Sequence, residues 1–183
     1  MDTIETARLR LRSFQHQDWQ AVYDYTSDAA VMMYIPEGQF TPAQAKAFVA
    51  DNMGEHARAV AVLFKTTDRL IGHMVFHPWF DSETYEIGWV FHRAHHGHGY
   101  ATEAAGALLH YGFEVLQLHR IIATCQPENV PSWRVMEKLG MRREGHFRQC
   151  IRRPENQWWD EYVYALLAEE WFRATHDPTG RQP

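Results

Sequence analysis

Hydrophobic and polar positions along the chain follow two periods, and together they predict alternating strands and helices. Alternation with period two, or a short apolar run bounded by turn residues, is typical of strands. Segments of this kind predict strands at residues 5–14, 59–64, 70–76, 85–91, 120–125, 141–148 and 158–167. Apolar residues at helical spacing predict helices that start near residues 18, 42, 101 and 133. The chain shows no internal repeats and no linker, so the pattern indicates a single domain over 1–183, with 170–183 as a frayed tail.

Caps and turn residues mark the ends of several predicted elements. Asp18 is a candidate N-cap for the first helix, and Thr41-Pro42 places a proline in the first turn of the second. Residues 66–69 form a polar turn between two strands, which predicts a hairpin. Pro78 should end the second strand of that hairpin, and Gly140 should end the helix over 133–139.

Composition excludes several classes of protein. The chain has 183 residues, 45% hydrophobic and 22% charged, and a formal charge of −5, which argues against nucleic acid as the main partner. No apolar run has transmembrane length, and the first residues lack the pattern of a signal peptide. Two cysteines, Cys125 and Cys150, are too few for a disulfide framework. We therefore expect reduced thiols in a cytoplasmic protein that does not bind membranes.

The stretch from Thr84 to Leu116 predicts a strand, a glycine turn and a helix in succession. Glycine allows the backbone to turn closely, and the free N–H groups of a first helical turn attract anions. A Walker loop would need a Lys-Ser/Thr pair where Tyr100-Ala101 stands. A dinucleotide fingerprint would need a small residue at Thr102 and an acidic residue at Gln126. The stretch predicts a phosphate site of another kind.

The segment His96-Gly97-His98-Gly99-Tyr100-Ala101 resembles the acyl-CoA motif Gln/Arg-x-x-Gly-x-Gly/Ala of the GNAT superfamily, with histidine at the first position. Its continuation to Ala104 is similar to the RimJ/RimL-like branch. A second motif, Asn129-x-x-Ser132 followed by Glu137-Lys138-Leu139-Gly140-Met141, also matches the family. The resemblance covers roughly residues 5–170. It implies an α/β (α+β) fold with a mixed, mostly antiparallel sheet of about seven strands, flanked by helices and splayed at the acyl-CoA site.

The resemblance also implies a reaction: transfer of an acetyl group from acetyl-CoA to a primary amine by direct attack in a ternary complex. Asn129 would hold the pantetheine arm, and Ser132 would donate to the departing thiolate or, alternatively, cap a helix. The remaining positions that the family pattern assigns to the cofactor are Trp89, Val90, Phe91, His96, Gly97, His98, Gly99, Tyr100, Ala101 and Thr102.

Glu86 is the candidate general base, because it lies on the strand that leads to the phosphate loop. The alternatives are that Glu86 is a structural carboxylate, or that the base acts through water. Some family members place the base on a later strand, where this chain has Cys150 and Ile151. Asp160 and Glu161 are either structural or an anchor for the substrate ammonium.

Two other functions fit the same residues. The first is a non-catalytic acyl-CoA-binding or sensor domain on the same fold. The second is a metal protein built on the cluster His92, His95, His96 and His98, whose spacing is too tight for a usual zinc site. No metal is expected for an acetyltransferase of this kind. The acceptor, a small molecule or a protein N-terminus, stays open, and a homodimer would be in keeping with the superfamily.

Overall fold

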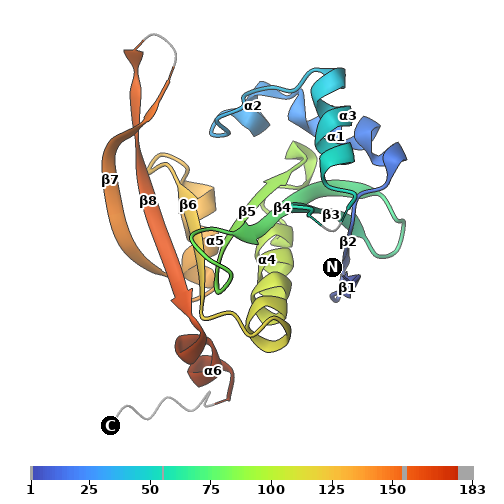
Figure 1. Ribbon diagram of the computed structural model, residues 1–183. Coiled ribbons are helices and arrows are strands. Elements are labelled where there is room, and N and C mark those ends of the chain that lie inside the picture. The colour runs from blue at the N-terminus through green and yellow to red at the C-terminus, as the bar shows by residue number, and fades with distance from the viewer. Residues whose placement is uncertain (1, 55, 154–155, 177–183) are drawn as a thin grey trace. The chain divides into compact units, whose positions relative to one another are not determined.

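The computed structural model describes residues 2–54, 56–153 and 156–176 (Figure 1). The chain divides into two compact units, Met1–His77 with Ile87–Leu108, and Pro78–Glu86 with Leu109–Pro183. One sheet of eight strands contributes to both, in the order β1-β2-β3-β4-β5-β6-β8-β7. The sheet is mixed, open and flanked by helices, so the predicted α/β class is confirmed.

The strands of the first unit pair antiparallel with their neighbours in sequence: β1 (Ile4–Glu5), β2 (Leu9–Arg12), β3 (Ala59–Phe64) and β4 (Leu70–Pro78). The hairpin over 66–69 and the strand end at Pro78 are confirmed. The single strand predicted over 5–14 is two strands, because Thr6 turns the chain between them. Its hydroxyl accepts the Leu9 amide at 2.9 Å. This break raises the strand number from the expected seven to eight.

Helices α1 (Trp19–Thr26), α2 (Ala29–Met32) and α3 (Pro42–Asp51) also belong to the first unit. Thr41 caps α3 in a capping box with Gln44, which confirms that start. Asp18 occupies the predicted N-cap position of α1, but its side chain makes no capping hydrogen bond there. Asp18 is the last residue of the short helix η1 (His16–Asp18), and its carboxylate accepts the Gln15 amide at 2.7 Å and two hydrogen bonds from Arg12, at 2.7 and 3.0 Å.

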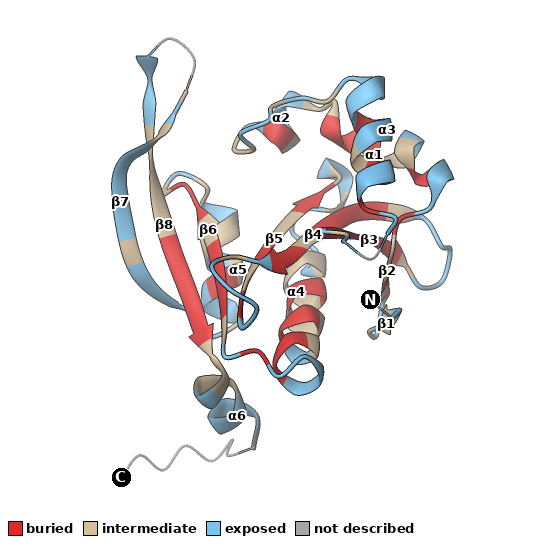
Figure 2. Cartoon of the chain, viewed as in Figure 1, coloured by how far each residue is buried: buried red, intermediate tan, exposed pale blue. Residues whose placement is uncertain are grey.

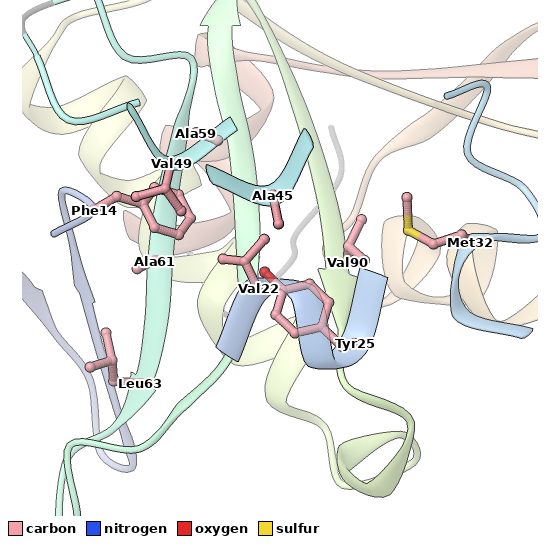
Figure 3. Close-up of a cluster of buried hydrophobic side chains, with 10 residues drawn as sticks. All are labelled: Phe14, Val22, Tyr25, Met32, Ala45, Val49, Ala59, Ala61, Leu63 and Val90. Atoms are coloured by element: carbon pink, nitrogen blue, oxygen red, sulfur yellow. The ribbon is translucent and has the colours of Figure 1, made fainter. Parts of the chain in front are cut away.

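The apolar sides of these helices and of β3 form a core cluster in the first unit (Figure 3). Val22 and Tyr25 of α1 and Val49 of α3 are at most 1% exposed. Five consecutive residues of β3 are buried, as expected of a strand covered on both faces. Val90 belongs to the same cluster, which fixes the direction of its side chain on β5 (Thr84–Phe91).

In the second unit, β6 (Arg120–Cys125) pairs parallel with the start of β5 and antiparallel with β8 (Trp158–Leu167). β8 in turn forms a long hairpin with β7 (Arg142–Arg152), which is exposed along most of its length (Figure 2). The loop predicted around 153–156 lies partly outside the described residues, because residues 154–155 are not described.

Three further helical elements follow the glycine loop at residues 96–99: α4 (Tyr100–His110), which continues into the π-helical turn η3 (Tyr111–Val115), and α5 (Val130–Lys138). α5 begins three residues before the predicted start. Residues 168–176 form helix α6 (Ala168–His176) where only a tail is expected. Trp171 of α6 stacks on Phe113 and donates to Glu114, and these contacts stabilise the helix. The rest of the expected tail, 177–183, lies outside the described residues.

Within the described ranges, no helix has the length and apolar character needed to cross a membrane.

Candidate active site

The segment between β5 and α4 is an exposed loop whose shape depends on two glycines. After the short helix η2 (Arg93–His95), Gly97 and Gly99 have φ values of +77° and +79°, in the left-handed region that favours glycine. The Glu103 amide donates to the Gly99 carbonyl at 3.0 Å, which is the first hydrogen bond of α4. The amides of Tyr100, Ala101 and Thr102 therefore precede the regular bonding of the helix.

The amides of this loop are available to a ligand. In the described ranges, the N–H groups of Gly97, Gly99 and residues 100–102 have no hydrogen-bond acceptor in the protein. Unpaired amides at the start of an eleven-residue helix attract negative charge, both by hydrogen bonding and through the helix dipole. The predicted cradle thus has the donors that a diphosphate needs.

The histidines of this segment bind mainly to its own backbone. His96 Nε2 lies 2.9 Å from the Phe91 carbonyl, and His98 Nδ1 lies 2.8 Å from the His96 carbonyl. The His96 ring therefore holds the loop against the end of β5, which differs from the side-chain contact with phosphate that its motif position suggests. His92 accepts from the Ala94 amide and pairs with Asp24. No group of three or more His, Cys, Asp or Glu that could hold a metal ion is found in the described residues.

Glu86 lies in the second unit, on the part of β5 that pairs with β6. It is opposite Ile122, and Thr124 Oγ1 lies 3.4 Å from its carboxylate. Glu161 of β8 belongs to the same group, because Thr124 also bonds to it. Burial first, and then the charge of Glu86, raise the pKa of Glu161, although the Thr124 bond acts against this shift. Two carboxylates therefore meet around one hydroxyl.

Asp160, by contrast, is tied to β7. It accepts from the Gln149 amide at 2.8 Å and lies 2.7 Å from His146 Nε2. The Gln149 amide and His146 lower the pKa of Asp160 and keep it ionised. Of the two acidic residues singled out in the sequence, Asp160 joins the two strands of the hairpin, and Glu161 lies beside Glu86.

Ser132 lies in the first turn of α5, close to the end of β6. Its hydroxyl bonds to the thiol of Cys125, which is buried and free. Burial raises the pKa of Cys125 to about 12, so this thiol stays protonated. Asn129 occupies the N-cap position of α5, and its carbonyl accepts the Ser132 amide at 3.0 Å. The alternative role of Ser132 as N-cap is therefore wrong.

The strand register places the two candidate catalytic residues on opposite faces of β6. Residues directly opposite each other in a sheet project to the same side, and neighbours along a strand alternate. Glu86 is opposite Ile122 and so shares a face with Thr124, whereas Ser132 contacts Cys125 of the other face. The register therefore separates the contacts of Glu86 and Ser132 at β6: Glu86 meets Thr124 on one face, and Ser132 meets Cys125 on the other.

Sequence reasoning missed two residues that the structure brings to these positions. Arg8 donates to the His98 carbonyl at 3.1 Å from ninety residues away. Thr124 bonds to both glutamates from the penultimate position of an apolar strand. The polar side chain of Thr124 within a buried strand was the one local signal available, whereas Arg8 offered none.

The comparisons with known proteins agree on one family. The family model described as acetyltransferase (GNAT) domain matches residues 8–142. The chain is 60% identical to the uncharacterised N-acetyltransferase YnaD of Bacillus subtilis over 168 residues, which is 92% of this chain and 98% of the relative.

Solved structures lead to the same family. A GNAT acetyltransferase from Bacillus anthracis superposes with a TM-score of 0.89 at 56% identity, covering 92% of this chain and all of that one. A spermidine N-acetyltransferase from Vibrio cholerae, solved with CoA and spermine, has the same fold at 20% identity, with a TM-score of 0.79 over 91% of this chain and 99% of its own. Together with the glycine loop, these matches establish that the chain belongs to the GNAT family and is an N-acetyltransferase.

Proposed function

We propose that the protein transfers the acetyl group of acetyl-CoA to a primary amine, either a protein N-terminal α-amine or a small-molecule amine, by direct attack in a ternary complex. The observation that carries this proposal is the row of unpaired amides from Gly97 to Thr102, which suits the diphosphate of acetyl-CoA. The presence of CoA in a neighbour of the same fold supports this donor. The sequence of the loop favours the RimJ/RimL-like branch.

The amine must lose a proton before or during attack, because an ammonium has no lone pair. Glu86 is proposed to accept that proton, directly or through water. Thr124 orients its carboxylate, and Glu161 bonds to the same hydroxyl. Ser132 is proposed to donate to the thiolate as it departs, while Asn129 at the start of α5 holds the pantetheine arm. Binding without turnover is the alternative left open by the sequence, and the 60% identity to a protein named as an N-acetyltransferase favours turnover.

The experiment that tests this proposal is a CoA-release screen. Acetyl-CoA is offered with peptides of different first residues and, in parallel, with small amines such as amino acids, polyamines and aminoglycosides. We expect one acceptor class to release CoA well above the rate of acetyl-CoA hydrolysis. If no class does so while the folded protein binds acetyl-CoA, the proposed reaction is wrong.

Glu86→Gln then tests the base. Loss of a general base typically lowers the rate by about 10²- to 10⁴-fold, so we expect kcat to fall in that range with little change in the KM for acetyl-CoA. Glu83→Gln is the matched control, because it makes the same change at an exposed position three residues away. Equal rates for the two variants would show that Glu86 is structural.

A further inference from the structure

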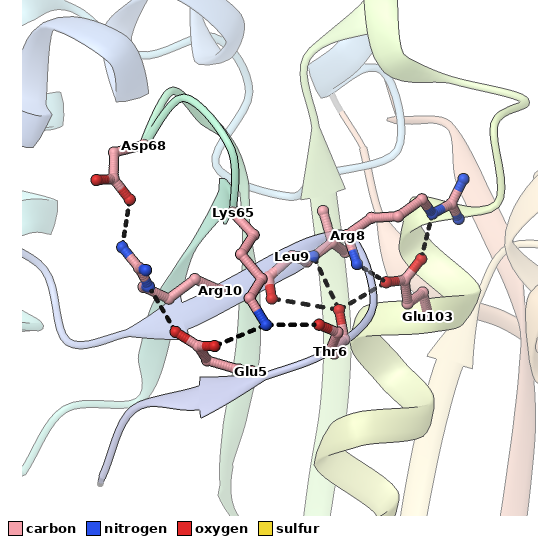
Figure 4. Close-up of polar contacts among 8 residues, drawn as sticks. All are labelled: Glu5, Thr6, Arg8, Leu9, Arg10, Lys65, Asp68 and Glu103. Atoms are coloured by element: carbon pink, nitrogen blue, oxygen red, sulfur yellow. Dashed lines mark hydrogen bonds and ion pairs between the residues drawn. The ribbon is translucent and has the colours of Figure 1, made fainter.

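Glu103 follows the phosphate loop, and its negative charge makes it a poor partner for a diphosphate. The structure shows what this carboxylate binds instead (Figure 4). Its Oε2 accepts from Arg8 Nε at 2.6 Å, and its Oε1 accepts the Arg8 amide at 2.9 Å and the Thr6 hydroxyl at 2.6 Å. One carboxylate of α4 thus holds the turn that precedes β2.

These bonds keep Glu103 charged. Burial favours the neutral carboxyl, but the hydrogen bonds from Thr6 and from both the amide and the guanidinium of Arg8 outweigh it, so the pKa of Glu103 lies below its ordinary value. A carboxylate that is 17% exposed and accepts three hydrogen bonds fixes the direction of the arginine. The Arg8 guanidinium also lies 4.5 Å from the centre of the Tyr100 ring, so its plane is held from two sides.

The guanidinium then contacts the loop itself. Arg8 Nη1 donates to the His98 carbonyl at 3.1 Å. All peptide bonds described are trans, so the Gly99 N–H points away from the His98 carbonyl of the same peptide unit. By holding the carbonyl on one side, Arg8 directs the Gly99 amide to the other side. Without it, Gly99 has the freedom to rotate this peptide, since glycine populates both signs of φ.

We propose that Arg8, fixed by Glu103 and Thr6, is a positioning residue for acyl-CoA: it holds the His98–Gly99 peptide so that the Gly99 amide faces the diphosphate. This inference rests on the proposed use of acetyl-CoA and adds a residue that belongs to neither family motif. Arg8 acts through the loop and makes no contact with the reacting atoms. Loss of Arg8 should therefore weaken the binding of acetyl donors that carry a diphosphate, and it should leave acetyl donors without a diphosphate unaffected.

Binding of CoA, measured by isothermal titration calorimetry, tests the proposal without knowledge of the acceptor. We expect Arg8→Met to weaken CoA binding about tenfold, which is about 1.4 kcal/mol. Arg10→Met is the matched control. Arg10 also makes two ion pairs, with Glu5 and Asp68, but they do not involve the loop (Figure 4). We expect this variant to bind CoA as the wild type does.

A comparison of donors separates positioning from a general structural effect. With an amine that the screen identifies, Arg8→Met should raise the KM for acetyl-CoA about tenfold at unchanged kcat. The kcat/KM for S-acetylpantetheine, which has no diphosphate, should stay within about twofold of the wild type. Glu103→Gln retains Arg8 and most of the side-chain volume, and we expect it to give a smaller shift of the same kind. Glu103→Gln is the variant to measure if Arg8→Met does not fold.

Three results would overturn the inference: equal CoA affinity in Arg8→Met and wild type, equal weakening by Arg10→Met, or an equal loss with both donors. Each of them leaves the proposed function intact, because the wild type still binds CoA. A wild-type protein that binds no CoA would instead overturn the proposed function, and this inference with it.

Discussion

His73 of β4 should make the stability of the protein depend on pH. The side chain is 4% exposed, and its Nδ1 lies 2.7 Å from the Tyr25 hydroxyl, beside the rings of Phe14 and Phe48. Burial lowers the pKa of His73 from 6.5 to about 3. It also raises the pKa of Tyr25 well above its ordinary value, so a protonated hydroxyl lies against a neutral imidazole.

The size of the effect follows from linkage. Below pH 6.5 the unfolded chain gains a proton at this histidine, whereas the folded chain gains it only near pH 3. The free energy of unfolding should therefore fall by about 1.4 kcal/mol for each pH unit in this window. Over the whole window the loss amounts to roughly 5 kcal/mol, a large part of the stability of an ordinary domain.

The assay is urea unfolding followed by tryptophan fluorescence at pH values from 7 to 4, on wild type and His73→Asn. Asparagine keeps an acceptor for Tyr25 but cannot gain the proton. The variant should be less stable at pH 7, because it leaves a cavity, but its stability should fall less steeply with acid. His110→Gln is the control, since solvent reaches this side chain in the folded protein. Parallel pH curves for wild type and His73→Asn would refute the reasoning.

Three substitutions in the first unit test close packing and buried hydrogen bonds. A Cβ on Gly72 would lie 2.5 Å from the Val90 carbonyl oxygen, so Gly72→Ala should lower the free energy of unfolding by about 3 kcal/mol in the same urea assay. A Cβ on Gly88 would lie 3.5 Å from a side-chain carbon, so Gly88→Ala should lower it by less than about 1 kcal/mol. Equal losses of stability would contradict the close approach at Gly72. Asn52 accepts the amides of Arg58 and Ala59 at 2.8 Å each, so Asn52→Ala should lower the melting temperature and cost about 2 to 3 kcal/mol, and an unchanged melting temperature would show that water replaces these bonds.

The local pattern of the sequence predicted most elements correctly. The apolar run of β6 and the strand over 158–167 have the expected bounds, and the Thr41-Pro42 start of α3 is confirmed by a full capping box. These features depend on residues within a few positions of one another, so side-chain period and capping chemistry suffice to identify them. The two family motifs belong to the same class, because each lies within a short segment.

Other features depended on contacts between distant residues. Nothing near Glu103 in the sequence indicates that its partner is Arg8, and nothing near Glu86 indicates that Glu161 is its neighbour. Helix α6 was missed for the same reason, since its stability comes from packing of Trp171 on Phe113.

The sequence by itself therefore determined most of the order of elements, the glycine loop and the class of chemistry. Only the tertiary structure decided which charged side chains meet, because such pairing depends on strand register and helix packing, and these bring together residues that are far apart in the chain.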